Sequence, residues 1–181
     1  MTTSGQKYDD KNSKLAELEV ISGSSAILHF AGRHLPSAIG RSGVRVDKHE
    51  GDGGTPSGFL SLRRILYRSD RLDSPKTSLK CEPLTENDGW CDDAAHQDYN
   101  RQIRLPHPAS HERLWLDNQL YDIIGVLGYN DDPIIPGRGS AIFLHVARPD
   151  MQPTDGCIAL SLDDLCWVLE QGLEAILIPN K

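Results

Sequence analysis

The chain has 181 residues, the usual size of a single domain with its own hydrophobic core. Its 26 acidic residues outnumber 19 basic ones, which gives a net charge of -7. No run of Lys or Arg is interleaved with aromatic residues, so the composition argues against a nucleic-acid-binding protein and against binding to an anionic membrane. We therefore expect a small or zwitterionic partner.

The four cysteines are too few for a disulfide-stapled fold and are expected to be thiols: Cys81, Cys91, Cys157 and Cys166. Residues 1–14 are polar and lack an apolar period, which predicts a disordered tail before a domain over residues 15–181. The tail contains no apolar signal segment, cleavage site or membrane span. This predicts a cytoplasmic protein without membrane insertion, or a periplasmic one if a leader has been trimmed.

The first part of the predicted domain has the alternation of β-strands. Residues 15–22 and 24–32 are separated by Gly23 and predict a hairpin, in which His29 is expected to face solvent. The β pattern continues through residues 34–68, with turns at 42–43, 52–54 and 55–56. The glycine cluster lacks the Gly-Lys-Ser/Thr ending of a phosphate-binding loop, so a turn is the preferred interpretation.

Later segments are mostly strands and loops. Residues 69–83 are rich in Pro and Ser and predict a surface loop, whereas residues 120–130 predict a buried strand. A helix is predicted from Ser161 to Gly172, with Ser161 as N-cap, an apolar face toward the core and Cys166 packed in the core. Residues 173–179 predict a last strand. Because strands predominate, the fold class is mainly β.

The strongest chemical signal lies between His145 and Leu160. An apolar strand over residues 140–147 carries His145, and Gly156 precedes Cys157 in a tight turn. A free cysteine is mostly protonated at neutral pH, and a neighbouring histidine is the usual way to form its thiolate. Glycine permits a backbone conformation in which successive amides point toward one spot, as an oxyanion hole requires. The pair therefore indicates acyl transfer through a thioester.

These residues resemble the signature of the L,D-transpeptidase (YkuD-type) catalytic domain: a histidine, a spacer, then Ser or Thr, His, Gly, Cys. His145, Thr154, Gly156 and Cys157 match it, while Asp155 replaces the second histidine and Ala159 replaces a frequent Arg or Asn. We interpret these departures as marks of a subgroup. The resemblance extends through residues 48–62, 88–93 and 110–115, and it implies a β-sandwich or open barrel with short helices.

The resemblance also implies roles for particular residues. Cys157 would be the nucleophile and His145 its base, oriented by the carbonyl of Val146. Amides around Asp155, Gly156 and Cys157 would bind the oxyanion. Further residues would contact the substrate: Arg148 or Arg138 at its carboxylate, Thr154 in the signature, Lys48, Asp52 and Thr55 beside the cleft, and Trp90, Tyr99 and Asn100 in a lid or wall.

Cys91, His96, His107 and His111 raise the possibility of a metal site. His107 and His111 have the i, i+4 spacing of zinc-binding helices, but Pro108 between them disfavours a continuous helix. Packing is the preferred interpretation. We therefore expect neither a metal nor a cofactor.

The implied substrate is a peptidoglycan stem peptide, cut between meso-diaminopimelate and the terminal D-alanine. With water as acceptor the activity is that of an L,D-carboxypeptidase acting on muropeptide tetrapeptides in cell-wall recycling, which we favour. With an amine as acceptor it is that of an L,D-transpeptidase that forms 3-3 cross-links or exchanges D-amino acids. The alternative from another class is an inactive muropeptide-binding module.

Overall fold

The computed structural model describes residues 14–180. The predicted disordered tail, residues 1–14, lies outside this range except for Lys14. The Lys14 ammonium donates to Glu174 at 2.5 Å, and its carbonyl accepts the amide of Glu174 at 2.8 Å. Within the described residues, no helix has both the length and the apolar character needed to cross a membrane.

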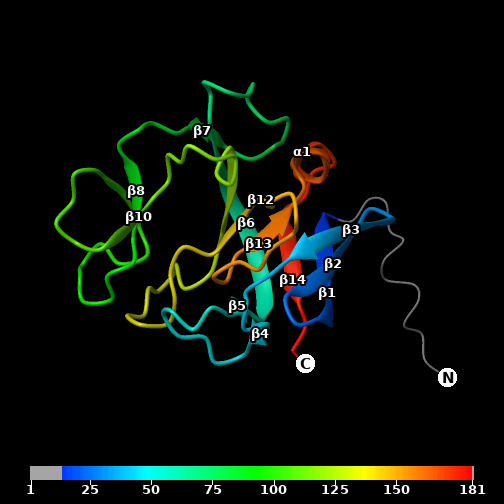
Figure 1. Cartoon of the computed structure of the whole chain (residues 1–181), viewed down its shortest axis with the longest axis horizontal. Coiled ribbons are helices and arrows are strands. Elements are labelled where there is room, and N and C mark those ends of the chain that lie inside the picture. Colours follow the sequence, from blue (N-terminus) through cyan, green and yellow to red (C-terminus); the bar gives the residue numbers. More distant parts are fainter. Residues whose placement is uncertain (1–13, 181) are drawn as a thin grey trace.

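The predicted mainly β fold is confirmed, and its main sheet closes on itself (Figure 1). This nine-stranded sheet has the order β11 (Ile123–Leu127), β12 (Phe143–Val146), β13 (Ile158–Leu160), β3 (Arg33–Ala38), β2 (Ser25–Phe30), β1 (Leu15–Ser22), β14 (Ala175–Ile178), β6 (Gly58–Tyr67) and β7 (Cys81–Pro83). Closure occurs because β11 pairs with β6 as well as with β12. The result is a barrel, whose interior holds the larger apolar core.

Two smaller sheets lie outside the barrel. One has the order β10 (His111–Arg113), β8 (Asp88–Cys91) and β9 (Gln102–Arg104), and the other pairs β4 (Val44–Arg45) with β5 (Thr55–Pro56). Figure 1 shows β8 and β10 on the far side of the molecule from β1 and β2. A second apolar cluster, which includes Trp90, Leu114, Phe143 and Cys157, fills the space between the barrel wall and the three-stranded sheet.

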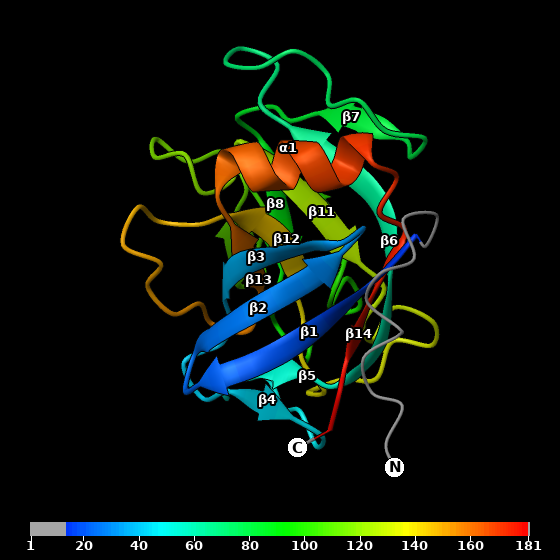
Figure 2. The same ribbon diagram turned by 90° about the vertical axis from the view of Figure 1, so that its right-hand side faces the viewer.

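The predicted helix is present as α1 (Leu162–Glu170), which lies across one end of the barrel in Figure 2. Ser161 caps it by accepting the amide of Asp164, and Gly172 follows with φ 84°. Leu165, Val168 and Leu169 are buried in the barrel core. These local signals explain why the helix begins and ends as the sequence predicted.

Two burial predictions are wrong. His29 is buried, because its ring contacts that of His34 and also reaches Glu19, at 2.8 Å. Cys166 is exposed on the outer face of α1 rather than packed in the core. The burial of His29 depends on its contacts with His34 and Glu19, and the exposure of Cys166 depends on which face of α1 meets the core. The local alternation of apolar residues shows neither.

Candidate active site

Two adjacent strands place His145 and Cys157 on one side of the barrel wall. Leu144 and Val146 of β12 belong to the barrel core, so His145 between them points outward. In the same way, Ile158 and Leu160 of β13 point inward. The strands are parallel, with Leu144 opposite Ile158. Alternation and register together bring His145 and Cys157 into one cavity.

The turn before Cys157 is attached to the segment that directly follows β3, the strand that neighbours β13. Thr154 donates its amide to the Ile39 carbonyl at 3.0 Å, and its own carbonyl accepts the amide of Arg41 at 2.9 Å. Its hydroxyl donates to the Cys157 carbonyl at 2.7 Å and accepts the amide of Gly156 at 3.2 Å. Thr154 thus holds both ends of the turn. The Gly156 amide is occupied, which leaves the amides of Asp155 and Cys157 for the expected oxyanion hole.

Gly156 occupies a position that other residues cannot adopt without strain. Its φ is 135°, and a Cβ placed there would lie 2.7 Å from the Gly54 carbonyl oxygen. We expect Gly156→Ala to lower the free energy of unfolding by about 2 to 4 kcal/mol, because backbone strain and a clash add together. Chemical denaturation followed by circular dichroism measures the loss.

The matched control for this prediction is Gly172→Ala. Gly172 also has a positive φ, 84°, but no atom lies within 4 Å of an added Cβ. We expect a loss of about 1 kcal/mol there, from strain alone. Equal losses at the two positions would contradict the role assigned to close packing between Gly156 and Gly54.

The Cys157 sulfur is buried, with the residue 8% exposed. Its Sγ donates to the Ala141 carbonyl at 3.2 Å and accepts the amide of Phe143 at 3.4 Å. Burial, followed by the nearby charge of Glu112, raises the pKa of this thiol to about 12. Among residues 14–180, no hydrogen bond joins it to His145. The resting site therefore holds a neutral thiol.

His145 has the tautomer of a base. Its Nδ1 donates to the Val146 carbonyl at 2.9 Å, as predicted, so the lone pair is on Nε2. The ring packs edge-on against Tyr121, with centroids 5.4 Å apart. Burial lowers the pKa of His145 to about 4, because a charged imidazole would lose its hydration. His145 is therefore neutral, and able to accept a proton, at physiological pH.

The cavity around these two residues has a volume of about 580 Å³, within the range of small-molecule sites. Its lining is highly charged. The charged side chains are Arg41, Lys48, Glu50, Asp92, Glu112, Arg148 and Asp155. Charged groups favour contact with water, and a lining of this kind suits a substrate that carries charges of both signs.

Several residues predicted to take part do line this cavity: Lys48, Arg148, Thr154 and Asp155. Lys48 is buried and donates to Asp52 at 2.6 Å, so Asp52 holds the ammonium in place rather than lining the cavity itself. The Asp155 carboxylate forms an ion pair with Arg41. Thr55 is buried, and its hydroxyl accepts the amide of Gly40 at 2.8 Å, which supports the segment between β3 and β4 to which the turn is attached.

Other predicted contacts lie behind the cavity instead of lining it. Trp90 packs against Phe143 and donates to Asn100 at 2.9 Å. Asn100 in turn accepts the amide of Ala141 at 3.1 Å, next to the carbonyl that holds the thiol. Tyr99 donates to Glu50 at 2.5 Å. Trp90, Tyr99 and Asn100 are therefore placed to support the cavity wall, the second of the two arrangements expected, and none of them is among the residues that line the cavity.

The two candidate arginines differ in position. Arg148 lines the cavity, and its guanidinium donates to Gln152 at 3.1 Å. Arg138 forms an ion pair with Asp47 outside the cavity lining. Of the two, only Arg148 is placed where it can meet a substrate carboxylate.

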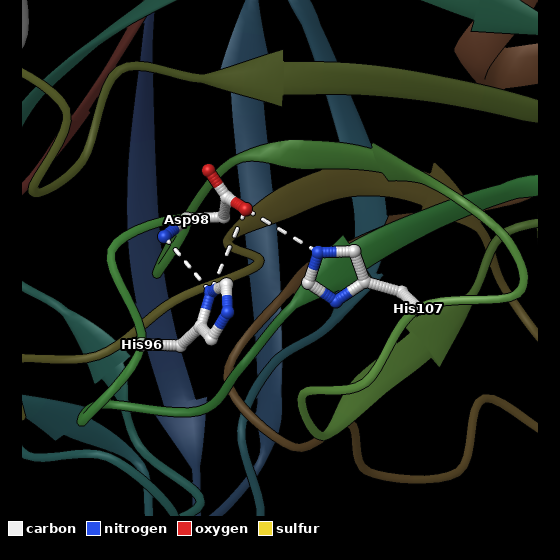
Figure 3. Close-up of side chains that lie close together, drawn as sticks. All are labelled: His96, Asp98 and His107. Atoms are coloured by element: carbon white, nitrogen blue, oxygen red, sulfur yellow. Dashed lines mark hydrogen bonds and ion pairs between the residues drawn. The ribbon is translucent and has the colours of Figure 1, made fainter.

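Three residues in the loops of the three-stranded sheet lie close enough together in space to hold a metal ion. The side chains of His96, Asp98 and His107 converge in Figure 3, with ligand atoms within 4.8 Å of one another. The Nδ1 atoms of both histidines accept backbone amides, from Asp98 and from Ala109. His107 Nε2 then donates to Asp98 at 3.3 Å. Protein partners explain the geometry of this cluster, so we assign it no function.

Residues that sequence reasoning missed complete the cavity. Glu50, Asp92, Glu112 and Tyr121 all line it, yet they lie on different loops and strands far from Cys157 in the sequence. Tyr121 donates to Glu112 at 2.5 Å. No local period marks these positions. Glu112 of β10 and Asp92 after β8 reach the site through the pairing of these strands and the attachment of their sheet to the barrel. Glu50 lies in the segment between β4 and β5, and Tyr121 lies just before β11.

Comparison with known proteins agrees with this geometry. No curated protein matches the chain closely enough to count as a relative. The family model of the YkuD L,D-transpeptidase catalytic domain, by contrast, matches residues 7–175 and so includes the barrel, His145 and Cys157. The match covers most of the chain, and we conclude that this protein belongs to the L,D-transpeptidase catalytic domain family.

Proposed function

We propose that this protein is an L,D-carboxypeptidase, which removes the terminal D-alanine from muropeptide tetrapeptides and acts in the cytoplasm during cell-wall recycling. Membership of the family supports activity on peptidoglycan peptides. The observation that carries the choice of water as acceptor is the charged lining around Cys157. An amine acceptor must react before water does, which favours an enclosed site that excludes solvent, and hydrated charges oppose this.

The first half of the reaction forms a thioester. The Cys157 thiol leaves the Ala141 carbonyl and transfers its proton to His145 Nε2, while the sulfur attacks the carbonyl carbon of the diaminopimelate residue. The amides of Asp155 and Cys157 stabilise the oxyanion. The intermediate then breaks the C–N bond, and His145 gives the proton to the departing amine of D-alanine. His145 is neutral again at the end of this step.

The second half releases the acyl group. His145 Nε2 takes a proton from water, the resulting hydroxide attacks the thioester carbonyl, and the C–S bond breaks. The proton returns to the sulfur, and the product is a tripeptide with a new carboxylate. Arg148 binds the carboxylate of D-alanine in the substrate, and the Arg41–Asp155 pair beside it accounts for the aspartate in the TDGC sequence, which we propose marks a subgroup.

A second candidate is transpeptidation, which one observation favours. A groove of about 750 Å³ adjoins the cavity, and the two share Leu120 and Arg148 as lining residues. The groove is also lined by Val146, Pro149 and Met151, so its surface is more apolar than the cavity. An acceptor peptide placed there would approach the thioester from the side of Arg148.

The experiment that tests the proposal is incubation of purified protein with a muropeptide tetrapeptide, followed by mass spectrometry. The expected result is conversion to tripeptide with release of D-alanine, and at most minor exchange when a D-amino acid or second stem peptide is added. Mainly 3-3 linked dimers would establish transpeptidation. Binding of tetrapeptide without any turnover would leave the muropeptide-binding module and contradict both enzyme activities.

We also expect an unusual pH profile. The pKa of His145 is lowered to about 4 by burial, so the base remains unprotonated as the pH falls from 8 to 5. The rate constant kcat/KM should thus be nearly constant over this range and fall tenfold per pH unit below about pH 4. A midpoint near the ordinary histidine value of about 6.5 would contradict the assignment of His145 as the base.

The control for this profile is a measurement of how much protein remains folded at each pH. The folded-state pKa of His145 lies below the unfolded value, so the unfolded chain binds the proton more tightly. The contribution to stability is complete above about pH 6.5 and is lost as the pH falls toward 4. Circular dichroism at each pH separates loss of the fold from protonation of the base.

A further inference from the structure

Residues 139–141 form the backbone segment on which the Cys157 thiol rests. The Cys157 Sγ donates to the Ala141 carbonyl at 3.2 Å and accepts the amide of Phe143 at 3.4 Å. Ala141 has a φ of 53°, a left-handed conformation that is unfavourable for a residue with a Cβ. The direction of its carbonyl, and with it the place of the sulfur, therefore depends on contacts that hold this strained conformation.

Asn100, in the loop between β8 and β9, supplies such a contact. Its side chain is buried, and its Oδ1 accepts the amide of Ala141 at 3.1 Å and the indole N–H of Trp90 at 2.9 Å. Its Nδ2 donates to the carbonyls of Tyr129 and Asn130 at 3.1 and 2.8 Å. Two donors thus meet the oxygen and two carbonyls meet the nitrogen. The orientation of the amide is fixed, and its capacity for hydrogen bonds is used in full.

The other two residues of the segment are also held by side chains from distant parts of the chain. Gly139 donates its amide to the Tyr99 hydroxyl at 3.0 Å, and Ser140 donates its hydroxyl to Glu50 at 2.7 Å. The segment is therefore fixed in the free protein. Asn100 does not line the cavity, so it can affect the reaction only through the backbone that it holds.

We propose that Asn100 is a positioning residue for the nucleophile: through the Ala141 amide, it fixes the carbonyl that holds the Cys157 sulfur in place for attack. The inference rests on the proposed function for the reaction that the sulfur performs. The thiol keeps a defined acceptor until His145 takes its proton, and the sulfur stays within reach of the Phe143 amide, which stabilises the thiolate. A small displacement of a reacting atom is enough to slow catalysis strongly.

The same contact lowers the reactivity of the free thiol. Burial and the charge of Glu112 raise the pKa of Cys157 to about 12, and the Phe143 amide opposes them. By accepting the S–H proton, the Ala141 carbonyl also favours the neutral thiol. Loss of the Asn100 side chain should thus act in opposite directions on two rates. Turnover falls because the sulfur is misplaced, whereas alkylation of the sulfur rises because the neutral thiol has lost its acceptor.

The test is Asn100→Gly. Asn100 has a φ of 55°, which glycine adopts without strain, so this variant removes the side chain and preserves the backbone conformation. We expect kcat for tetrapeptide to fall about 10- to 100-fold, the effect of a displacement of about 1 Å, while KM changes less than about threefold. Alkylation of Cys157 by iodoacetamide at neutral pH should rise about tenfold, the size of one lost hydrogen bond. Peptide mapping by mass spectrometry assigns the alkylated cysteine.

Two further variants separate positioning from damage to the fold. Asn100→Asp keeps an acceptor for Ala141 but loses the two donors, so both rates should lie between those of wild type and Asn100→Gly. Asp88→Asn is the matched control for stability. Asp88 is buried in the same three-stranded sheet and accepts bonds from Thr85 and Gln102, away from residues 139–141. At equal fractions of folded protein, Asp88→Asn should leave kcat and alkylation at the wild-type values.

The proposal is overturned if Asn100→Gly and Asp88→Asn, compared at equal folded fractions, change both rates by the same factors, or if Asn100→Gly raises KM and leaves kcat unaltered. Should Asn100→Gly fail to fold, Asn100→Asp takes its place, and wild-type values of both rates would overturn the proposal. Alkylation needs no substrate. Faster alkylation of Asn100→Gly, with no turnover even by the wild-type protein, would support the positioning role and contradict the carboxypeptidase.

Discussion

Replacing Cys157 with alanine is expected to abolish turnover, with kcat reduced by at least about 10³-fold, while the fold remains intact. No other described thiol lines the cavity, so no second sulfur can form the thioester. Alanine fits the space that cysteine leaves, and the amide of Phe143 loses only a weak acceptor. Release of D-alanine from tetrapeptide, measured by mass spectrometry, gives the rate.

The control for Cys157→Ala is Cys166→Ala, which removes an exposed thiol from the outer face of α1. It should keep full activity. Thermal unfolding of both variants checks that the barrel is preserved. If Cys157→Ala retains more than a few per cent of the wild-type rate, the nucleophile has been assigned to the wrong residue.

Replacing His145 with alanine is the second large effect, with an expected loss of about 10²- to 10⁴-fold in kcat/KM, the range for removal of a general base. The buried thiol has a pKa of about 12, so at neutral pH it depends on a base for deprotonation. His145 is the histidine of the cavity, and its Nδ1 bond to Val146 leaves Nε2 available. Initial rates at pH 7 measure the loss.

Raising the pH provides a diagnostic for the His145→Ala variant. Without the base, the remaining rate should increase tenfold per pH unit up to the limit of protein stability, because hydroxide then removes the proton. His49→Ala is the matched control, since its ring is exposed and lies outside the cavity lining. A variant at His145 whose rate is unchanged, or falls no more than that of His49→Ala, would rule out the proposed base.

Prediction from the sequence succeeded where the deciding interactions are local. The helix at 162–170 has its cap, apolar face and terminating glycine within a few residues of one another. Strands β1, β2, β11 and β14 were marked by short apolar or alternating runs. The orientation of His145 follows from period two in an apolar strand, and the turn at Gly156 follows from the freedom of glycine. Such features can be predicted from the sequence because each depends only on neighbouring residues.

The candidate site was only partly predictable. His145, Thr154 and Cys157 could be identified because they lie in one motif on neighbouring segments. Trp90 and Asn100 were expected at the substrate, but the structure places them behind Phe143 and Ala141. The local sequence around an aromatic residue is the same whether its side chain lines the cavity or supports the cavity wall from behind, so the sequence cannot distinguish the two positions. Which of the two positions a side chain takes is decided only when the three-stranded sheet packs against the barrel.

The fold class, the helix, the main strands and the motif that contains His145 and Cys157 could all be read from the sequence alone, because hydrophobic periodicity and turn chemistry act over a few residues. The pairing of β11 with β6 that closes the barrel, and the placement of Glu50, Asp92 and Glu112 in one cavity with Cys157, became apparent from the three-dimensional arrangement alone. It also decided that Arg148, and not Arg138, lines that cavity. These outcomes depend on contacts between segments far apart in the chain, whose free energy exists only after the barrel and the three-stranded sheet have packed together.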